Sequence, residues 1–171
     1  MRATKDNKMR AIKGKEGEVL YVGDFDSVKE CAEQAVENWV SLVGANFEWA
    51  NLQGVNFRRA KLKRSNFIQA NLYNADFRDA YLNGADFSYA DLEGCVGNMK
   101  EIKSMQLEQY MITYTATRLQ IGCTNLEIAQ WWDLSDDDID YMDEGALEFW
   151  KKWKDVIKNI IEISPAIGND S

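Results

Sequence analysis

Residues 40–94 repeat every five positions, in the blocks VSLVG, ANFEW, ANLQG, VNFRR, AKLKR, SNFIQ, ANLYN, ADFRD, AYLNG, ADFSY and ADLEG. A small residue opens most blocks, a polar residue usually follows, and a Phe or Leu stands at the centre. A helix repeats every 3.6 residues or so and a strand every two, so neither produces a strict period of five. Such a period is typical of a stacked solenoid, in which each unit buries its apolar positions against its neighbours.

The blocks resemble the pentapeptide-repeat family, whose pattern is Ala-(Asp/Asn)-(Leu/Phe)-X-X; ANFEW, ANLQG and ADFSY fit it directly. The resemblance covers 55 of the 171 residues, in eleven unbroken units. It implies a mainly β fold, a short right-handed quadrilateral β-helix with four units per coil and about 2.75 coils. The departures from the pattern do not threaten this fold. They are Val40, Val55 and Ser65 for the opening Ala, and Ser41, Lys61 and Tyr81 for Asp/Asn.

The sequence on either side of the repeat predicts two flanking modules. Residues 1–39 form a polar terminus, mobile over the first dozen residues, followed by a strand at 18–22 and a helix at 28–39. A solenoid end exposes unpaired backbone groups, so we expect this strand and helix to cap it. Residues 95–171 predict a small α+β module that is acidic and rich in Trp. Its expected elements are strands at 99–107, 110–115 and 118–122, a helix from Thr124 or Asn125 to Trp132, and a helix over 143–163.

Composition argues against catalysis and against a membrane segment. The chain contains no histidine, and its three cysteines lack the spacing of a metal site. No phosphate-binding loop or nucleophile motif is present. We therefore expect no enzyme activity, no cofactor and no metal. No apolar run approaches the roughly 18 residues that span a bilayer, which predicts a cytoplasmic protein without a membrane partner.

The outward positions of the repeat suggest two surfaces. With four units per coil, units four apart share a face, so Phe47, Phe67 and Phe87 should form one buried ladder, and Phe57 and Phe77 another. Outward from the first ladder lie Trp49, Ile68 and Tyr89, which we expect to form an aromatic and apolar stripe that binds a partner or a second copy. A basic corner is expected from Arg58, Arg59, Lys61, Lys63, Arg64 and Arg78.

The net charge of −8 is concentrated in the C-terminal module, where seven basic and fourteen acidic residues follow position 94. The candidate acidic binding surface is Asp133, Asp136, Asp137, Asp138, Asp140, Asp143 and Glu144. A solvated, capped helix start is the alternative interpretation of this run. A calcium loop needs spaced oxygens around a Gly and a closing Glu, which the run lacks. The four Trp residues of the module favour core packing, with an interface as the alternative.

These features predict a non-catalytic protein that works by binding another protein. The module after residue 94 contains the runs Gly97-Asn-Met-Lys-Glu-Ile-Lys-Ser-Met-Gln-Leu107 and Leu119-Gln-Ile-Gly-Cys123. With these runs it resembles a module found in pentapeptide proteins of tailed phages and prophages. This resemblance implies a phage-derived inhibitor of a bacterial nucleic-acid-directed enzyme or defence complex, acting in the cytoplasm of the bacterial host.

An alternative is mimicry of DNA through the acidic surface, directed at a gyrase, topoisomerase or nuclease. At a strand spacing of roughly 4.8 Å the repeat is about 13 Å long. This length copies about four base pairs of DNA. Mimicry by the rod would therefore need two rods end to end in a homodimer. The second alternative is a structural or oligomerisation scaffold, and direct nucleic-acid binding is disfavoured by the net charge.

Overall fold

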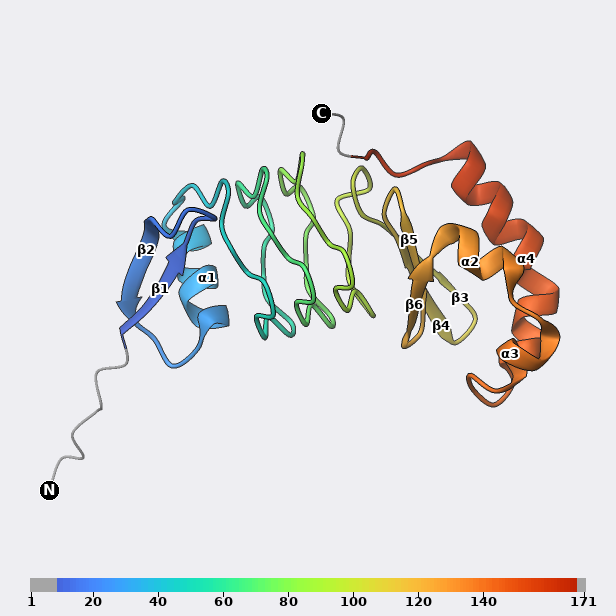
Figure 1. The fold of residues 1–171 in the computed structure, drawn as a ribbon. Coiled ribbons are helices and arrows are strands. Elements are labelled where there is room, and N and C mark those ends of the chain that lie inside the picture. The colour runs from blue at the N-terminus through green and yellow to red at the C-terminus, as the bar shows by residue number, and fades with distance from the viewer. Residues whose placement is uncertain (1–8, 169–171) are drawn as a thin grey trace, which may run out of the picture.

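The computed structural model describes residues 9–168. Figure 1 shows three parts in a row: an N-terminal hairpin with a helix, a stack of coils, and a C-terminal sheet with helices. The N-terminal part contains β1 (Met9–Lys13), β2 (Val19–Asp24) and α1 (Val28–Glu37). The C-terminal part contains β3 (Lys103–Leu107), β4 (Tyr110–Tyr114), β5 (Arg118–Ile121), β6 (Thr124–Glu127), α2 (Ile128–Asp133), α3 (Asp136–Asp140) and α4 (Ala146–Ile163).

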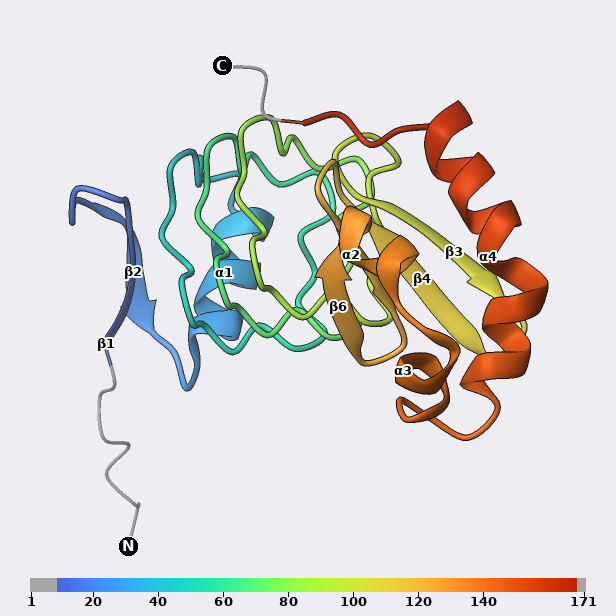
Figure 2. The ribbon, with the colours of Figure 1, turned by 45° about the vertical axis from the view of Figure 1, so that its right-hand side comes forward.

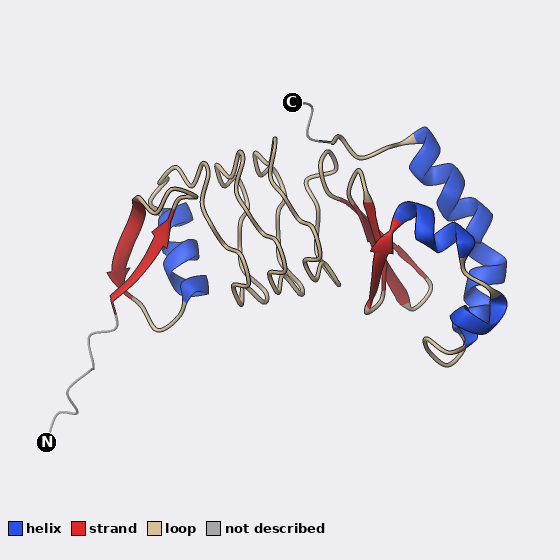
Figure 3. Ribbon diagram, viewed as in Figure 1, coloured by secondary structure: helices blue, strands red, loops and turns tan. Residues whose placement is uncertain are grey.

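The repeat forms a β-helix-type solenoid, in which the chain returns to the same position after twenty residues. Parallel bridges join Asn46 to Asn66 and Asn66 to Asp86, and five further bridges have the same spacing. The Phe47 N–H donates to the Asn66 carbonyl at 2.7 Å, and the Phe67 N–H to the Asp86 carbonyl at 2.8 Å. Four five-residue units therefore make one coil. Figure 3 draws the coils as loops because each side contributes a single bridge rather than a continuous ladder.

Aromatic rings fill much of the solenoid core. The Phe67 ring is stacked between Phe47, with centroids 5.1 Å apart, and Phe87, at 4.9 Å. Phe57 stacks on Phe77 at 5.5 Å. Both predicted ladders are therefore confirmed. They also meet each other across the interior, because Phe67 and Phe77 make an edge-to-face contact at 5.9 Å.

The Asp/Asn at the second position of a unit has a local structural role. Its side-chain oxygen accepts from the backbone N–H two residues later, as in Asn66 to Ile68 and Asp86 to Ser88, both at 2.9 Å. The same bond recurs in six further units. A short polar side chain that bonds its own backbone in this way stabilises a turn. The preference for Asp/Asn thus follows from the turn at each corner.

The fifth residue of every unit has left-handed backbone geometry. Four of these corners are glycines, Gly44, Gly54, Gly84 and Gly94. The other seven have φ between 57° and 60° and are Trp49, Arg59, Arg64, Gln69, Asn74, Asp79 and Tyr89. A left-handed non-glycine residue costs about 1–2 kcal/mol. At five of these seven corners the backbone N–H donates to the next coil, as Trp49 does to the Ile68 carbonyl at 3.0 Å, and these hydrogen bonds help to offset the cost.

The N-terminal hairpin and helix lie against the first coil and bond its backbone. The Asn46 N–H, which has no earlier coil to bond to, donates to the Lys13 carbonyl at 2.7 Å. The Asn56 N–H donates to Glu33 Oε1 on α1 at 3.0 Å. The prediction of a mobile terminus is wrong for β1, because Ile12 is only 2% exposed and packs in the solenoid core. The part of that prediction on residues 1–8 lies outside the described residues.

The coil geometry continues beyond Gly94 for one more unit, residues 95–99. Val96 makes a parallel bridge to Asp76, and Met99 has a corner φ of 61°. Cys95 is fully buried, and its Sγ lies 3.0 Å from the Leu72 carbonyl oxygen. The first strand of the C-terminal module therefore begins at residue 103, later than the predicted residue 99.

The C-terminal module is an antiparallel sheet in the order β3-β4-β5-β6, and Figure 2 shows α4 running alongside β3 and β4. The fourth strand, β6, occupies the predicted start of the short helix, which begins instead at Ile128. Residues 136–140 of the acidic run form the one-turn helix α3. One side of β5 faces the helices, where Leu119 packs with Trp131 and Trp150. Alternation along the strand turns Gln120 toward the last coil.

Side chains of this sheet bond the last coil. Gln120 Oε1 accepts from the Leu92 N–H at 2.7 Å, and its Nε2 donates to Asp91 Oδ1 at 2.8 Å. Asn125 Nδ2 donates to the Ala90 carbonyl at 2.6 Å. Both ends of the solenoid are therefore closed by other parts of the same chain.

Candidate interaction surfaces

All seven predicted acidic residues are exposed, and they lie between the end of α2 and the loop before α4. Three of them form the first turn of α3, which begins after Ser135. The Ser135 N–H donates to Asp138 Oδ2 at 2.9 Å, and the Asp138 N–H donates to Ser135 Oγ at 3.2 Å. Hydrogen bonds from the Ser135 side chain and backbone lower the pKa of Asp138. Acids 136–138 thus stabilise a helix N-terminus.

The carboxylates of the acidic run differ in their surroundings, because some are paired and others are not. Lys151 on α4 lies across from it and forms a 2.8 Å ion pair with Asp136. Asp143 accepts a hydrogen bond from the Tyr110 hydroxyl at 3.0 Å. Within residues 9–168, no ion-pair partner lies near the remaining carboxylates that carry no capping bond, which are Asp133, Asp137, Asp140 and Glu144. In the same range no group of three potential ligands could hold a metal ion.

The aromatic stripe is present but discontinuous. Trp49 and Tyr89 are 67% and 63% exposed at corners of one column, yet the corner between them is Gln69. Ile68 is half-buried and stands one position earlier in its unit, above Glu48 and not above Trp49. The prediction of a stack of three is therefore wrong, because the fourth and fifth positions of a unit belong to separate columns.

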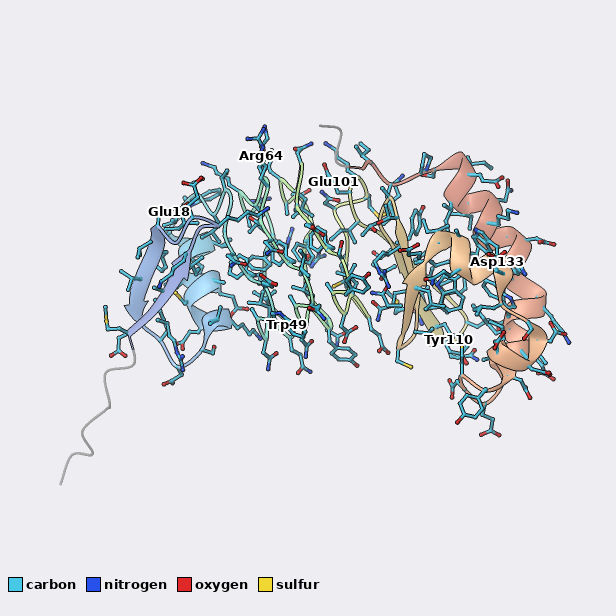
Figure 4. All side chains as sticks on the ribbon, in the orientation of Figure 1. Glu18, Trp49, Arg64, Glu101, Tyr110 and Asp133 are labelled. Carbon is cyan, nitrogen blue, oxygen red and sulfur yellow. The ribbon has the colours of Figure 1, made fainter. Side chains whose placement is uncertain are left out.

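The C-terminal module contacts the far end of this column. The Arg118 guanidinium carbon lies 4.6 Å from the centre of the Tyr89 ring, close enough for a cation–π contact. Trp49 lies farther from the module, and Figure 4 places it toward the lower edge of the coils. Trp49 thus lies away from the C-terminal module, whereas Tyr89 borders it.

The basic corner is partly neutralised. Arg78 forms an ion pair with Asp76 at 2.6 Å, and Arg59 lies 3.9 Å from Asp79. The exposed cations that remain along the next side are Lys61, Lys63 and Arg64. Figure 4 places Arg64 at the upper edge of the coils.

Two exposed aromatic residues were not predicted. Trp39 is the last residue of the helix predicted over 28–39, but α1 ends at Glu37. Trp39 has a φ of 58°, and its side chain is 69% exposed. Tyr141 follows α3 and is 94% exposed. Nothing in the sequence distinguishes Tyr141, because the acids around it give no helical or strand period.

Sequence reasoning also missed a hollow of about 390 Å³ between the last coil and the C-terminal module. Residues from both parts line it, including Glu93 from the coil and Tyr110 and Asp143 from the module. The predicted Trp packing is confirmed beside it, where Trp131 and Trp150 lie 5.3 Å apart and both are buried.

Comparison with known proteins is informative for the coils. A family model described as pentapeptide repeats, in eight copies, matches residues 41–79 and 60–96. A solved structure with a similar segment is HetL from the cyanobacterium Nostoc sp. strain PCC 7120, described as a pentapeptide repeat protein involved in heterocyst differentiation regulation. The match to HetL has 28% identity and a TM-score of 0.21, and covers 33% of this chain and 22% of HetL.

The curated proteins contain no match to the chain. Among residues 9–168, no helix is long and apolar enough to cross a membrane. The five-residue period and the bridges twenty residues apart are both consistent with the family match. Residues 41–96 of the chain therefore match the pentapeptide-repeat family.

Proposed function

We propose that the chain is a non-enzymatic protein–protein interaction protein that presents Trp49 and Tyr89 to a protein partner. The observation that carries this proposal is the exposure of both rings, 67% and 63%, at corners of one column of the solenoid. Aromatic side chains dominate the energetics of protein interfaces, and each buries roughly 150–250 Å². Coils bonded to their neighbours hold both rings in place, which lowers the entropic cost of binding.

The proposal includes the finer geometry that the family resemblance implies, a right-handed quadrilateral β-helix of about 2.75 coils. The partner we propose is a bacterial nucleic-acid-directed enzyme or defence complex, held inhibited in the cytoplasm by a phage-derived protein. The exposed carboxylates of 133–144 support this choice, because enzymes that act on nucleic acids carry basic surfaces. The net charge of −8 argues against direct contact with nucleic acid.

DNA mimicry is the alternative, and the carboxylates of Asp133, Asp137, Asp140 and Glu144 are the observation in its favour. The pairing of Asp136 with Lys151 weakens it. End-to-end stacking of two rods, which a longer mimic needs, is opposed by the caps at both ends of the solenoid. A scaffold or oligomerisation role through the aromatic column is the second alternative.

The experiment is cross-linking of the purified full chain in bacterial lysate, followed by mass spectrometry, with three variants. Trp49→Ser with Tyr89→Ser should remove the specific cross-links. The matched control is Tyr81→Ser, which removes an equally exposed ring, 62%, from another side of the coils. Equal loss in the control, or no loss in the double variant, would refute the aromatic surface.

Two further measurements separate the alternatives. Asp137→Lys with Asp140→Lys should weaken partner binding less than the Trp49 and Tyr89 double variant does, if the two aromatic rings carry most of the binding energy. Loss of partner binding in this charge-reversed variant, with binding by the Trp49 and Tyr89 double variant unchanged, would favour mimicry. Sedimentation of the wild type and of the Trp49 and Tyr89 double variant reports on the scaffold role, which predicts a change in oligomer mass.

A further inference from the structure

The hollow between the last coil and the C-terminal module is bounded by groups with fixed positions. Gln120 and Asn125 bond the sheet to the coil, which sets the spacing of the two sides. On the module side, the Trp131 indole N–H donates to the Leu119 carbonyl at 2.7 Å. The volume of about 390 Å³ lies within the range of pockets that hold small organic ligands, roughly 300–1,000 Å³.

Aromatic rings form its deeper wall. Trp131, Phe149 and Trp150 line the hollow and are only 2–4% exposed. The Tyr110 ring packs on Phe149 with centroids 4.6 Å apart. These rings present apolar area and negatively polarised faces, which attract cations as well as apolar groups.

The charge of the lining is negative. Two carboxylates, Glu93 and Asp143, line the hollow, and none of the described residues that line it is a lysine or an arginine. Asp143 accepts from the Tyr110 hydroxyl, which places a carboxylate beside the aromatic wall. Burial and, to a smaller extent, the neighbouring Asp91 carboxylate raise the pKa of Glu93.

We propose that this hollow binds an organic cation with an apolar body. The body lies against Trp131, Phe149 and Trp150, and the cationic group lies at Asp143 and the edge of Tyr110, with Glu93 adding to the negative field. A carboxylate and aromatic faces together recognise an ammonium or guanidinium group, whereas an anion meets only repulsion. The cation is either a free amine or a basic side chain of a bound peptide. This site is separate from the aromatic column and does not depend on it.

Calorimetric titration of the full chain with three probes tests the proposal. The probes share a naphthyl body and differ at one end: 2-(2-naphthyl)ethylammonium, 2-naphthaleneethanol and 2-naphthylacetate. The cation should bind at least about tenfold more tightly than the alcohol, as expected for a charge-assisted contact. Equal binding of the acetate, or no binding of the cation, overturns the proposal.

Two isosteric variants and one control locate the cation. Asp143→Asn should reduce the preference for the cation over the alcohol by about tenfold, and Glu93→Gln by a smaller factor. Asp137→Asn removes the same charge from an exposed position outside the hollow, so it should leave the preference unchanged. Circular dichroism of each variant checks that the fold is retained. An equal effect of all three variants means that only net charge matters, and overturns the site.

Cys123 provides a second readout. It is the exposed cysteine and lines the hollow, whereas Cys31 and Cys95 are buried. Bound probe should slow alkylation of Cys123 by iodoacetamide, and unchanged alkylation at saturating probe contradicts binding in the hollow. The source of the cation is distinguished with acetyl-Leu-Lys-Leu-amide and its norleucine counterpart. Preference for the lysine peptide over the naphthyl amine assigns a peptide side chain, and the reverse assigns a free amine.

Discussion

The Leu92 backbone N–H donates to the side-chain oxygen of Gln120 at 2.7 Å. One coil earlier, the equivalent N–H of Leu72 donates to the Asp91 carbonyl, nineteen residues further along the chain. Gln120 therefore supplies the acceptor that a further coil would have supplied. Glu33 does the same for the Asn56 N–H at the other end. An unsatisfied buried polar group is costly, and the Leu92 bond is buried, so Gln120 is part of what ends the solenoid.

Replacement of Gln120 by Leu tests this role. The variant leaves the Leu92 N–H without its acceptor and removes one of the two donors to Asp91, at a position that is 3% exposed. We expect the free energy of unfolding to fall by about 1–3 kcal/mol in urea denaturation. Gln53→Leu is the control, because Gln53 is an exposed side chain of the coils. A Gln120→Leu variant as stable as the control would show that water replaces the lost contacts.

The left-handed corners give a second prediction, at Gly54. Its φ is 63°, and the nearest atom to an added Cβ is Lys29 Nζ at 3.6 Å, so space does not limit substitution. Gly54→Val should destabilise the chain by more than about 1 kcal/mol through backbone strain alone. Gly54→Asn should cost less, since Asn74 adopts the same geometry at the next coil. The comparison is made by thermal unfolding, and equal losses would argue against a backbone cause.

The stacked Phe ladder predicts a gradient of stability along the solenoid. Phe67 is fully buried between two stacked rings, whereas Phe87 is 7% exposed at the end of the ladder. Phe67→Ala should cost about 3–5 kcal/mol, the usual range for a buried Phe. Phe87→Ala should cost less, because the gap it leaves can be partly filled. Denaturant unfolding of both variants measures the difference, and a larger loss at Phe87 would contradict the expected order.

The ion pair between Asp76 and Arg78 predicts a pH effect. Burial raises the pKa of Asp76, but hydrogen bonds and charge from Arg78 outweigh it, and the net pKa lies below the ordinary value. A carboxyl with a lowered pKa in the folded state adds stability above its unfolded pKa of about 4, and loses it as the pH falls through the folded value. Arg78→Gln should therefore raise the pKa of Asp76 in an NMR titration. An unchanged pKa would mean that Arg78 does not hold this carboxylate ionised.

The repeat could be predicted because its period is local. Each Ala, Phe or Leu is buried by a neighbour at a fixed distance in sequence. The stacking of Phe47 on Phe67 therefore follows from their separation of four units. The corner geometry could not be predicted in the same way, because Trp49 and Arg59 stand where other units have glycine. Their left-handed φ is imposed by hydrogen bonds to the adjacent coils.

Contacts between residues that are far apart in the chain could not be predicted from the sequence. Glu93 and Asp143 line one hollow although fifty positions separate them, and no local period relates them. Lys151 neutralises Asp136 only because α4 folds back beside α3. Strand β1 was not predicted because Arg10 and Lys13 make its sequence look like a polar terminus. The strand contributes mainly Ile12 to the buried side of the cap. Such placements depend on how the modules dock, which composition and spacing do not encode.

The twenty-residue coil also constrains how such a chain can change in length. The caps bond particular backbone groups of the first and last coils, through Glu33 and Gln120. Insertion of one five-residue unit would rotate the C-terminal module by a quarter of a turn about the rod axis, since four units make a coil. Only the addition of whole coils leaves the relative orientation of the two end modules unchanged. The orientation of the C-terminal module relative to the N-terminal cap can therefore change only in steps of a quarter turn. Every change in the number of units that is not a multiple of four also changes this orientation.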